Sequence, residues 1–184
     1  MHIRKTEILK DVELKLISEL MKNSRRSDRE LAHAIGVSQP TVSRVIAKLE
    51  KQRVIREYTI IPDFKKLGYT LASLTFINLK SGLTREELQK AREITTQDLC
   101  EDCPSEIVLF ERGMGINFTG VIIAMHKNYS SYTKLKDRIK EYDFVEQLQT
   151  DSFIIDLQDE VHYRYLTFST LAKNLLEGSC AVKR

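Results

Sequence analysis

Six residues between positions 39 and 51 have the types and spacing of side chains that recognise nucleic acid. They are one amide, two hydroxyls and three cations: Gln39, Thr41, Ser43, Arg44, Lys48 and Lys51. The apolar residues between them recur at helical spacing and would face inward: Val42, Val45, Ile46 and Leu49. Amides, hydroxyls and guanidinium groups hydrogen-bond to base edges, whereas ammonium groups pair with phosphates. On one helix face, we therefore expect the first four residues to read double-stranded DNA and the two lysines to hold phosphates.

The stretch from 27 to 50 carries the start and stop signals of two short helices. Ser27 followed by Glu30 is a capping box, and Gly36 supplies the left-handed residue that ends the first helix. Ser38 would cap the second helix, and Pro40 stands in its first turn, where the missing N–H costs nothing. The pattern predicts a helix-turn-helix unit, with Pro40 part of its DNA-contacting surface. The alternative is an ordinary helical hairpin with a solvated face.

Charge is unevenly distributed along the 184 residues. Residues 1–66 carry 15 Lys or Arg and 9 Asp or Glu, whereas residues 67–184 carry 14 and 17. A basic front half indicates a polyanion-binding module joined to a second part. The sequence has no apolar run long enough to cross a bilayer, and three cysteines are too few for a secreted disulfide framework. We expect a cytoplasmic protein with no membrane association.

The elements around the helix-turn-helix unit predict an α+β protein. A helix is expected at 11–22, a two-stranded wing or short strand at 54–61, and a hinge at 62–68. Strands are expected at 71–80, 106–111, 118–126 and 144–157, with helices at 84–98 and, capped by Ser130 or Ser131, up to 142. This β-α-β-β-α-β order is ferredoxin-like. The tail pattern predicts a short strand at 161–165 and a helix at 169–177 that Gly178 ends.

The segments RELAHAIGVSQPTVSRVIAKLEKQRVI and DFKKLG resemble the DNA-binding signature and the hinge of the Lrp/AsnC transcription regulators. The match is best over residues 9–79, and over 79–157 only the order of elements matches. The resemblance implies a winged helix-turn-helix domain at 1–61, a hinge at 62–68, a ferredoxin-like RAM domain at 69–157 and an extension at 158–184. It implies a sequence-specific DNA-binding regulator that works without an enzymatic activity, a metal or a cofactor.

Self-association is expected as well. One helix-turn-helix reads only a few base pairs, and two-fold symmetry multiplies its specificity. The apolar strand set is also too large for one sheet face. We predict a homodimer or higher homo-oligomer whose interface lies within residues 69–184.

The resemblance further implies a small effector, such as an amino acid, held between subunits at sheet edges and turns. We place this site at 112–117, in RGMGIN, where the family has a Gly-x-x-Asp-aromatic turn. Arg112 and backbone N–H groups at Gly113 and Gly115 would hold a carboxylate, and Asn117 would accept from an ammonium group. A plain β-hairpin turn is the alternative.

Two other interpretations stay open. Cys100 and Cys103 form a C-x-x-C that suits a metal or redox sensor, although two reduced thiols in a helix–strand connection are the simpler explanation. Some Lrp-like proteins act on tetrapyrroles, and His126, His162 and Tyr163 would be the candidate contacts for such an enzyme.

Overall fold

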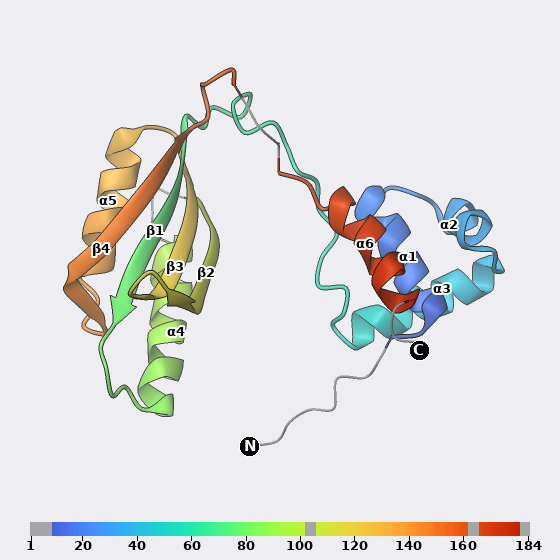
Figure 1. The fold of residues 1–184 in the computed structure, drawn as a ribbon, viewed down its shortest axis with the longest axis horizontal. Coiled ribbons are helices and arrows are strands. Elements are labelled where there is room, and N and C mark those ends of the chain that lie inside the picture. Colours follow the sequence, from blue (N-terminus) through green and yellow to red (C-terminus); the bar gives the residue numbers. More distant parts are fainter. Residues whose placement is uncertain (1–8, 102–105, 162–165, 181–184) are drawn as a thin grey trace. The chain divides into compact units, whose positions relative to one another are not determined.

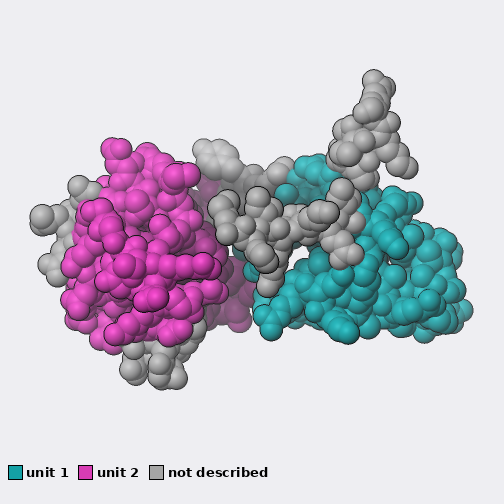
Figure 2. Space-filling view, turned by 90° about the horizontal axis from the view of Figure 1, so that it is seen from below, with its two compact units in different colours: residues 1–61, 163–184 teal, residues 62–162 magenta. Residues whose placement is uncertain are grey.

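The structure is a computed structural model that describes residues 9–101, 106–161 and 166–180 (Figure 1). The chain folds as two units (Figure 2). We call residues 1–61 and 163–184 the helical unit, and residues 62–162 the sheet unit. The last part of the chain therefore belongs with the first, rather than standing alone after the sheet.

The helical unit contains α1 (Asp11–Lys22), α2 (Asp28–Ile35), α3 (Gln39–Lys51) and α6 (Ser169–Cys180). The capping box before α2 is confirmed: the Ser27 hydroxyl accepts from the Glu30 N–H, and the Glu30 carboxylate accepts from the Ser27 N–H. Gly36 ends α2 with φ +74°, as predicted. Apolar side chains of α1, α2 and α3 form one buried cluster: Leu16, Leu31, Ala32, Val42 and Leu49.

Residues 54–61 do not form the predicted wing or strand, because no neighbouring strand within the described residues pairs with them. They run as extended chain instead, and three contacts hold them against the helices of the same unit. Ile55 packs on the apolar cluster, the Tyr58 hydroxyl donates to Glu50 at 3.0 Å, and the Ser24 hydroxyl donates to the Thr59 carbonyl at 3.4 Å.

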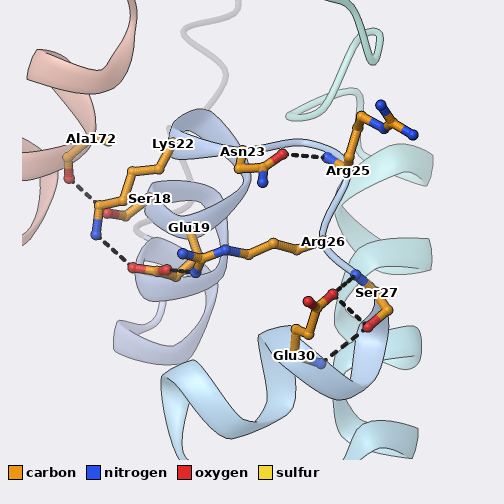
Figure 3. Close-up of polar contacts among 9 residues, drawn as sticks. All are labelled: Ser18, Glu19, Lys22, Asn23, Arg25, Arg26, Ser27, Glu30 and Ala172. Atoms are coloured by element: carbon orange, nitrogen blue, oxygen red, sulfur yellow. Dashed lines mark hydrogen bonds and ion pairs between the residues drawn. The ribbon is translucent and has the colours of Figure 1, made fainter.

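The tail helix α6 packs against α1, and Figure 1 shows the two side by side. The Ser18 hydroxyl donates to the Ala172 carbonyl at 2.7 Å, and both residues are fully buried (Figure 3). The predicted end at Gly178 is wrong, since α6 continues to Cys180. Glycine lowers helix propensity by only about 1 kcal/mol, so a glycine near the end of a helix does not have to end it. The predicted strand at 161–165 falls mostly outside the described residues.

The sheet unit has the predicted β-α-β-β-α-β order, which confirms the ferredoxin-like arrangement. Its elements are β1 (Leu71–Leu79), α4 (Arg85–Glu101), β2 (Glu106–Gly115), β3 (Phe118–His126), α5 (Tyr129–Lys140) and β4 (Val145–Asp156). The strands lie in the antiparallel order β2-β3-β1-β4. Asn128, rather than Ser130 or Ser131, caps α5, because its side chain accepts from the Ser131 N–H. Leu135 and Ile139 of α5 pack on Ile77 and Ile122 of the sheet.

The opposite side of the sheet is apolar. Side chains alternate along a strand, so residues next to the buried Ile77 and Ile122 point away from the helices. The strand register places seven apolar residues on this side, which we call the open face: Leu74, Phe76, Leu109, Val121, Ile123, Phe153 and Ile155. Phe153 is 63% exposed and Ile155 is 40% exposed. The strand set does exceed what one sheet face can bury within a single chain.

The hinge makes a turn closed by Gly68, which has φ +87°. It is joined to the segment that leaves β4. The Leu157 N–H donates to the Thr70 carbonyl at 2.9 Å, and the Lys65 ammonium donates to the Gln158 carbonyl at 3.2 Å. The two segments that connect the sheet unit to the helical unit therefore leave the sheet together.

Candidate nucleic-acid interface

The predicted DNA-reading residues share the outer face of α3. Val42 and Leu49 of the same helix are fully buried, which fixes the rotation of α3 about its axis. On the other side, most of the predicted set is exposed, with two members partly buried. The exposed residues are Gln39, Pro40, Ser43, Arg44 and Lys51. Thr41 and Lys48 are the partly buried pair.

Lys48 is bound within the protein. Its ammonium donates to Glu13 of α1 at 2.7 Å, where the lysine side chain is 40% exposed and the glutamate side chain only 5%. The other Glu13 oxygen accepts from the Lys10 N–H at 2.7 Å and so caps α1. The hydrogen bond from Lys48, followed by that from Lys10, lowers the pKa of Glu13. Lys48 therefore ties α3 to α1, a role that its sequence position did not indicate.

Ser43 is also paired. Its hydroxyl donates to the Asp28 carboxylate at the start of α2, and the alternative acceptor, the Gln39 carbonyl, is 3.3 Å away. Near the start of α3, the Ser38 and Thr41 hydroxyls are 2.8 Å apart. Ser38 makes no side-chain bond to the backbone of α3, so it begins the helix without the predicted cap. Arg44 and Lys51 make no ion pair within the described residues.

The connection between α1 and α2 is held by one carboxylate. Figure 3 shows Glu19 of α1 between Lys22 and Arg26, with which it pairs. The hydrogen bond from Lys22 is the main cause of the lowered pKa of Glu19. The side chain of Asn23 accepts from the Arg25 N–H at 3.0 Å and shapes the same turn. Part of the basic excess of residues 1–66 thus pairs with a carboxylate within α1 and the connection to α2.

The predicted effector residues lie on the β2–β3 hairpin and are all exposed. Arg112 and Gly113 belong to β2, which extends to Gly115, so the predicted turn at 112–117 is too long. Only Ile116 and Asn117 form the loop, with φ of +47° and +61°, the left-handed pair typical of a two-residue hairpin. The side chain of Asn78 donates to the Asn117 carbonyl at 2.9 Å.

The structure describes only some of the residues that were candidates for a tetrapyrrole site or a metal or redox site. His126 is fully buried, its Nε2 is 2.7 Å from the Ser73 hydroxyl, and its ring stands edge-on to Tyr132. It is part of the core, which corrects its interpretation as a tetrapyrrole contact. His162, Tyr163 and Cys103 lie outside the described residues, as does the side chain of Cys100.

Metal-binding and membrane-spanning features are absent from the described residues. Within that part of the chain, no group of three or more His, Cys, Asp or Glu side chains is placed to hold a metal ion. Its helices include none that combines the length and the apolar character needed to span a bilayer.

Comparison with known proteins gives consistent results. A family of winged helix-turn-helix DNA-binding domains matches residues 9–56. An uncharacterised HTH-type transcriptional regulator of Pyrococcus furiosus is 31% identical over 147 residues, which are 79% of this chain and 92% of that protein. LrpC of Bacillus subtilis is 37% identical over 73 residues, 40% of this chain and 51% of that protein.

Solved structures agree in fold. B. subtilis LrpC superposes with a TM-score of 0.61 at 22% identity, covering 85% of this chain and 99% of that one. E. coli AsnC superposes with a TM-score of 0.60 at 22% identity, covering 86% of this chain and 98% of that one. Both structures are matched almost completely, so this chain contains residues that have no counterpart in them.

Proposed function

The chain belongs to the Lrp/AsnC family of DNA-binding transcription regulators, and on this premise we propose that it reads DNA with the outer face of α3. The observation that carries the proposal is the two-sided character of that helix. Val42 and Leu49 are buried, while the amide, the hydroxyl and the guanidinium of Gln39, Ser43 and Arg44 are exposed. Hydrogen-bonding groups held on a rigid helix suit base edges in the major groove.

We assign Gln39, Thr41, Ser43 and Arg44 to base edges and Lys51 to phosphate, with Pro40 in the contact surface at the helix start. Lys48 is assigned mainly to its ion pair with Glu13. Arg44→Ala should weaken binding to a selected site by about 1–3 kcal/mol and relax the sequence preference. Lys90→Ala on α4, which removes a cation from the sheet unit, is the matched control. Equal, undiminished affinity in both variants would exclude α3 as the reading helix.

We propose that two copies associate through the open face of the sheet, as a homodimer that larger assemblies can build on. Phe153, Ile155 and Leu109 would otherwise leave a contiguous apolar surface in water. Phe153→Ser should shift the full-length protein from dimer to monomer in sedimentation experiments at micromolar concentration. Met114→Ser, which changes a fully exposed side chain near the end of β2, should leave the dimer intact. A dimer that survives the Phe153 change would move the interface elsewhere.

We propose that a small effector with a carboxylate, such as an amino acid, binds at the β2–β3 hairpin. Arg112 and Asn117 supply a donor fork and an acceptor, and both are exposed for contact with a ligand. An amino acid that binds should stabilise the folded protein by mass action, by about 2.7 kcal/mol at 100 times its dissociation constant, and so raise its melting temperature. Arg112→Ala should abolish that shift and Lys90→Ala should retain it. If both retain it, the site lies off the hairpin.

These assignments describe a regulator without a catalytic role. His126, a candidate contact of the alternative enzyme, is fully buried and hydrogen-bonds to Ser73 inside the core, which supports this proposal. Such a protein works in the compartment that holds its DNA, which we propose to be the cytoplasm.

A further inference from the structure

We infer that Asp28 and Ser43 act together as a specificity-determining pair, which selects a base that presents an amino group in the major groove. The inference rests on the proposed reading of DNA by α3 and adds a residue from outside that helix. Asp28 is the first residue of α2, and its sequence position gave no indication of a contact with DNA.

The pair is defined by the direction of one hydrogen bond. Ser43 has a single hydroxyl proton, and its nearest acceptor is the Asp28 carboxylate rather than the more distant Gln39 carbonyl. A bond to a charged acceptor is the stronger of the two. The proton therefore points toward α2, and only the lone pairs of the Ser43 oxygen remain for a partner outside the protein.

The pair thus offers acceptors alone. The oxygens of the Asp28 carboxylate accept hydrogen bonds, and the Ser43 hydroxyl already donates its only proton to them. In the major groove, cytosine presents an N4 amino donor and adenine an N6 amino donor beside its N7 acceptor. Guanine and thymine present acceptors at this edge, apart from the thymine methyl group. Cytosine should therefore be preferred, followed by adenine, with guanine and thymine disfavoured because acceptor would face acceptor.

A carboxylate beside a DNA-reading helix also has an electrostatic consequence. Asp28 makes no ion pair within the described residues. Its charge is felt at Tyr58, whose pKa is raised to about 12 by burial, by the hydrogen bond to Glu50 and to a smaller degree by Asp28. A negative charge near phosphates weakens binding to every sequence. Asp28 would therefore lower the affinity for all DNA while it increases the preference for one type of base.

The ordinary explanation of Asp28 is that it stabilises the N-terminus of α2. Ser27 and Glu30 form the capping box at that terminus, so the backbone there has partners without Asp28. A purely structural Asp28 would change the melting temperature when replaced, and would leave base preference unchanged. The two roles are therefore separable by experiment.

The test is selection of bound sites from random double-stranded DNA with the full chain, Asp28→Asn, Ser43→Ala and Asp11→Asn. The last variant removes a carboxylate from α1 that pairs with Lys15. The wild type should prefer cytosine or adenine at one position of each half-site. In Ser43→Ala this preference should fall about fivefold or more, with other positions unchanged. Asp28→Asn should shift it toward guanine or thymine, because an amide donates, and should bind unrelated DNA more tightly. Asp11→Asn should keep the wild-type profile.

Unchanged preference at every position in both test variants would overturn the inference, as would a wild-type preference for guanine or thymine at the affected position. If Asp28→Asn fails to fold, Ser43→Ala decides the matter, since Ser43 is exposed on α3. Arg44→Ala in the same selection distinguishes failure of the α3 assignment from failure of the Asp28–Ser43 pair. An unaltered profile for Arg44→Ala would contradict the reading of DNA by α3 itself, whereas an altered profile with inert Asp28 and Ser43 variants would contradict this inference alone.

Discussion

Replacing Glu13 by glutamine should make DNA binding more dependent on salt. In the wild type, the Lys48 ammonium donates to the buried Glu13 carboxylate at 2.7 Å, so its charge is largely neutralised before DNA arrives. A glutamine side chain at this position would keep a hydrogen-bond acceptor and lose the charge. The Lys48 ammonium would then be able to pair with a phosphate, and each new phosphate contact adds about 0.9 to the slope of log affinity against log salt.

The expected loss of folding stability differs between replacing Lys48 and replacing Glu13. Exposed ion pairs contribute about 0–1 kcal/mol, and removing one partner of a fully buried pair costs about 3–5 kcal/mol. Glu13 is buried and Lys48 is 40% exposed, so this pair lies between the limits. We expect Lys48→Ala, which strands the carboxylate, to destabilise the helical unit by about 2 kcal/mol, and Glu13→Gln by about 1 kcal/mol.

The assay is a set of binding titrations at several salt concentrations with Glu13→Gln, Lys48→Ala and Lys51→Ala. Lys51 is exposed near the same end of α3 and makes no ion pair within the described residues, which makes it the matched control. Lys51→Ala should lower the salt slope by about 0.9, and Lys48→Ala by less than half of that. Equal losses for the two lysines, or an unchanged slope for Glu13→Gln, would refute the assignment of Lys48 to Glu13.

Three further outcomes are expected. Folding lowers the pKa of Glu13, so the contribution of this carboxylate to stability is complete above its ordinary pKa of 4.5 and is lost as the pH falls through the folded pKa. In denaturant melts below pH 4.5, Glu13→Gln should therefore lose less stability than the wild type. Ala172→Asp should destabilise the protein by more than about 2 kcal/mol in thermal melts because Ala172 is fully buried, whereas the exposed neighbour change Lys173→Asp should cost under about 0.5 kcal/mol. Ile116→Asn should stabilise the hairpin by about 1 kcal/mol in the same melts, since Ile116 is β-branched at φ +47° and asparagine tolerates that conformation.

The features that the sequence predicted correctly are those that local chemistry determines. Ser27 and Glu30 make their capping box three residues apart, and Gly36 takes the left-handed conformation that ends α2. Thr84 and Glu87 form a second box of the same kind before α4. The alternation and length of the apolar runs likewise located all four strands, because burial of one face dictates period and register.

The features that were missed depend on contacts between distant parts of the chain. Ser18 and Ala172 are 154 positions apart, and Lys48 and Glu13 are 35 apart. Neither pair produces a periodic pattern in the sequence. The first needs only a small residue opposite a serine, and the second only a carboxylate opposite a lysine. The prediction of a wing was wrong for a related reason. Residues 54–61 have the composition of a strand, but a strand forms only where a partner strand is present. Ser43 was expected to face DNA alone for the same reason, because Asp28 lies 15 positions away.

The long-range contacts have a common element in α1. Glu13 and Ser18 of that helix point about 140° apart around its axis, since each residue advances about 100°. Through Glu13, α1 holds Lys48 of α3, and through Ser18 it holds the tail helix α6. Leu16 between them is fully buried in the same unit. Helix α1 therefore contacts both α6 and α3. Since α6 follows the sheet unit in the chain, the segment after β4 gives that unit a second covalent connection to the DNA-binding helices, in addition to the hinge.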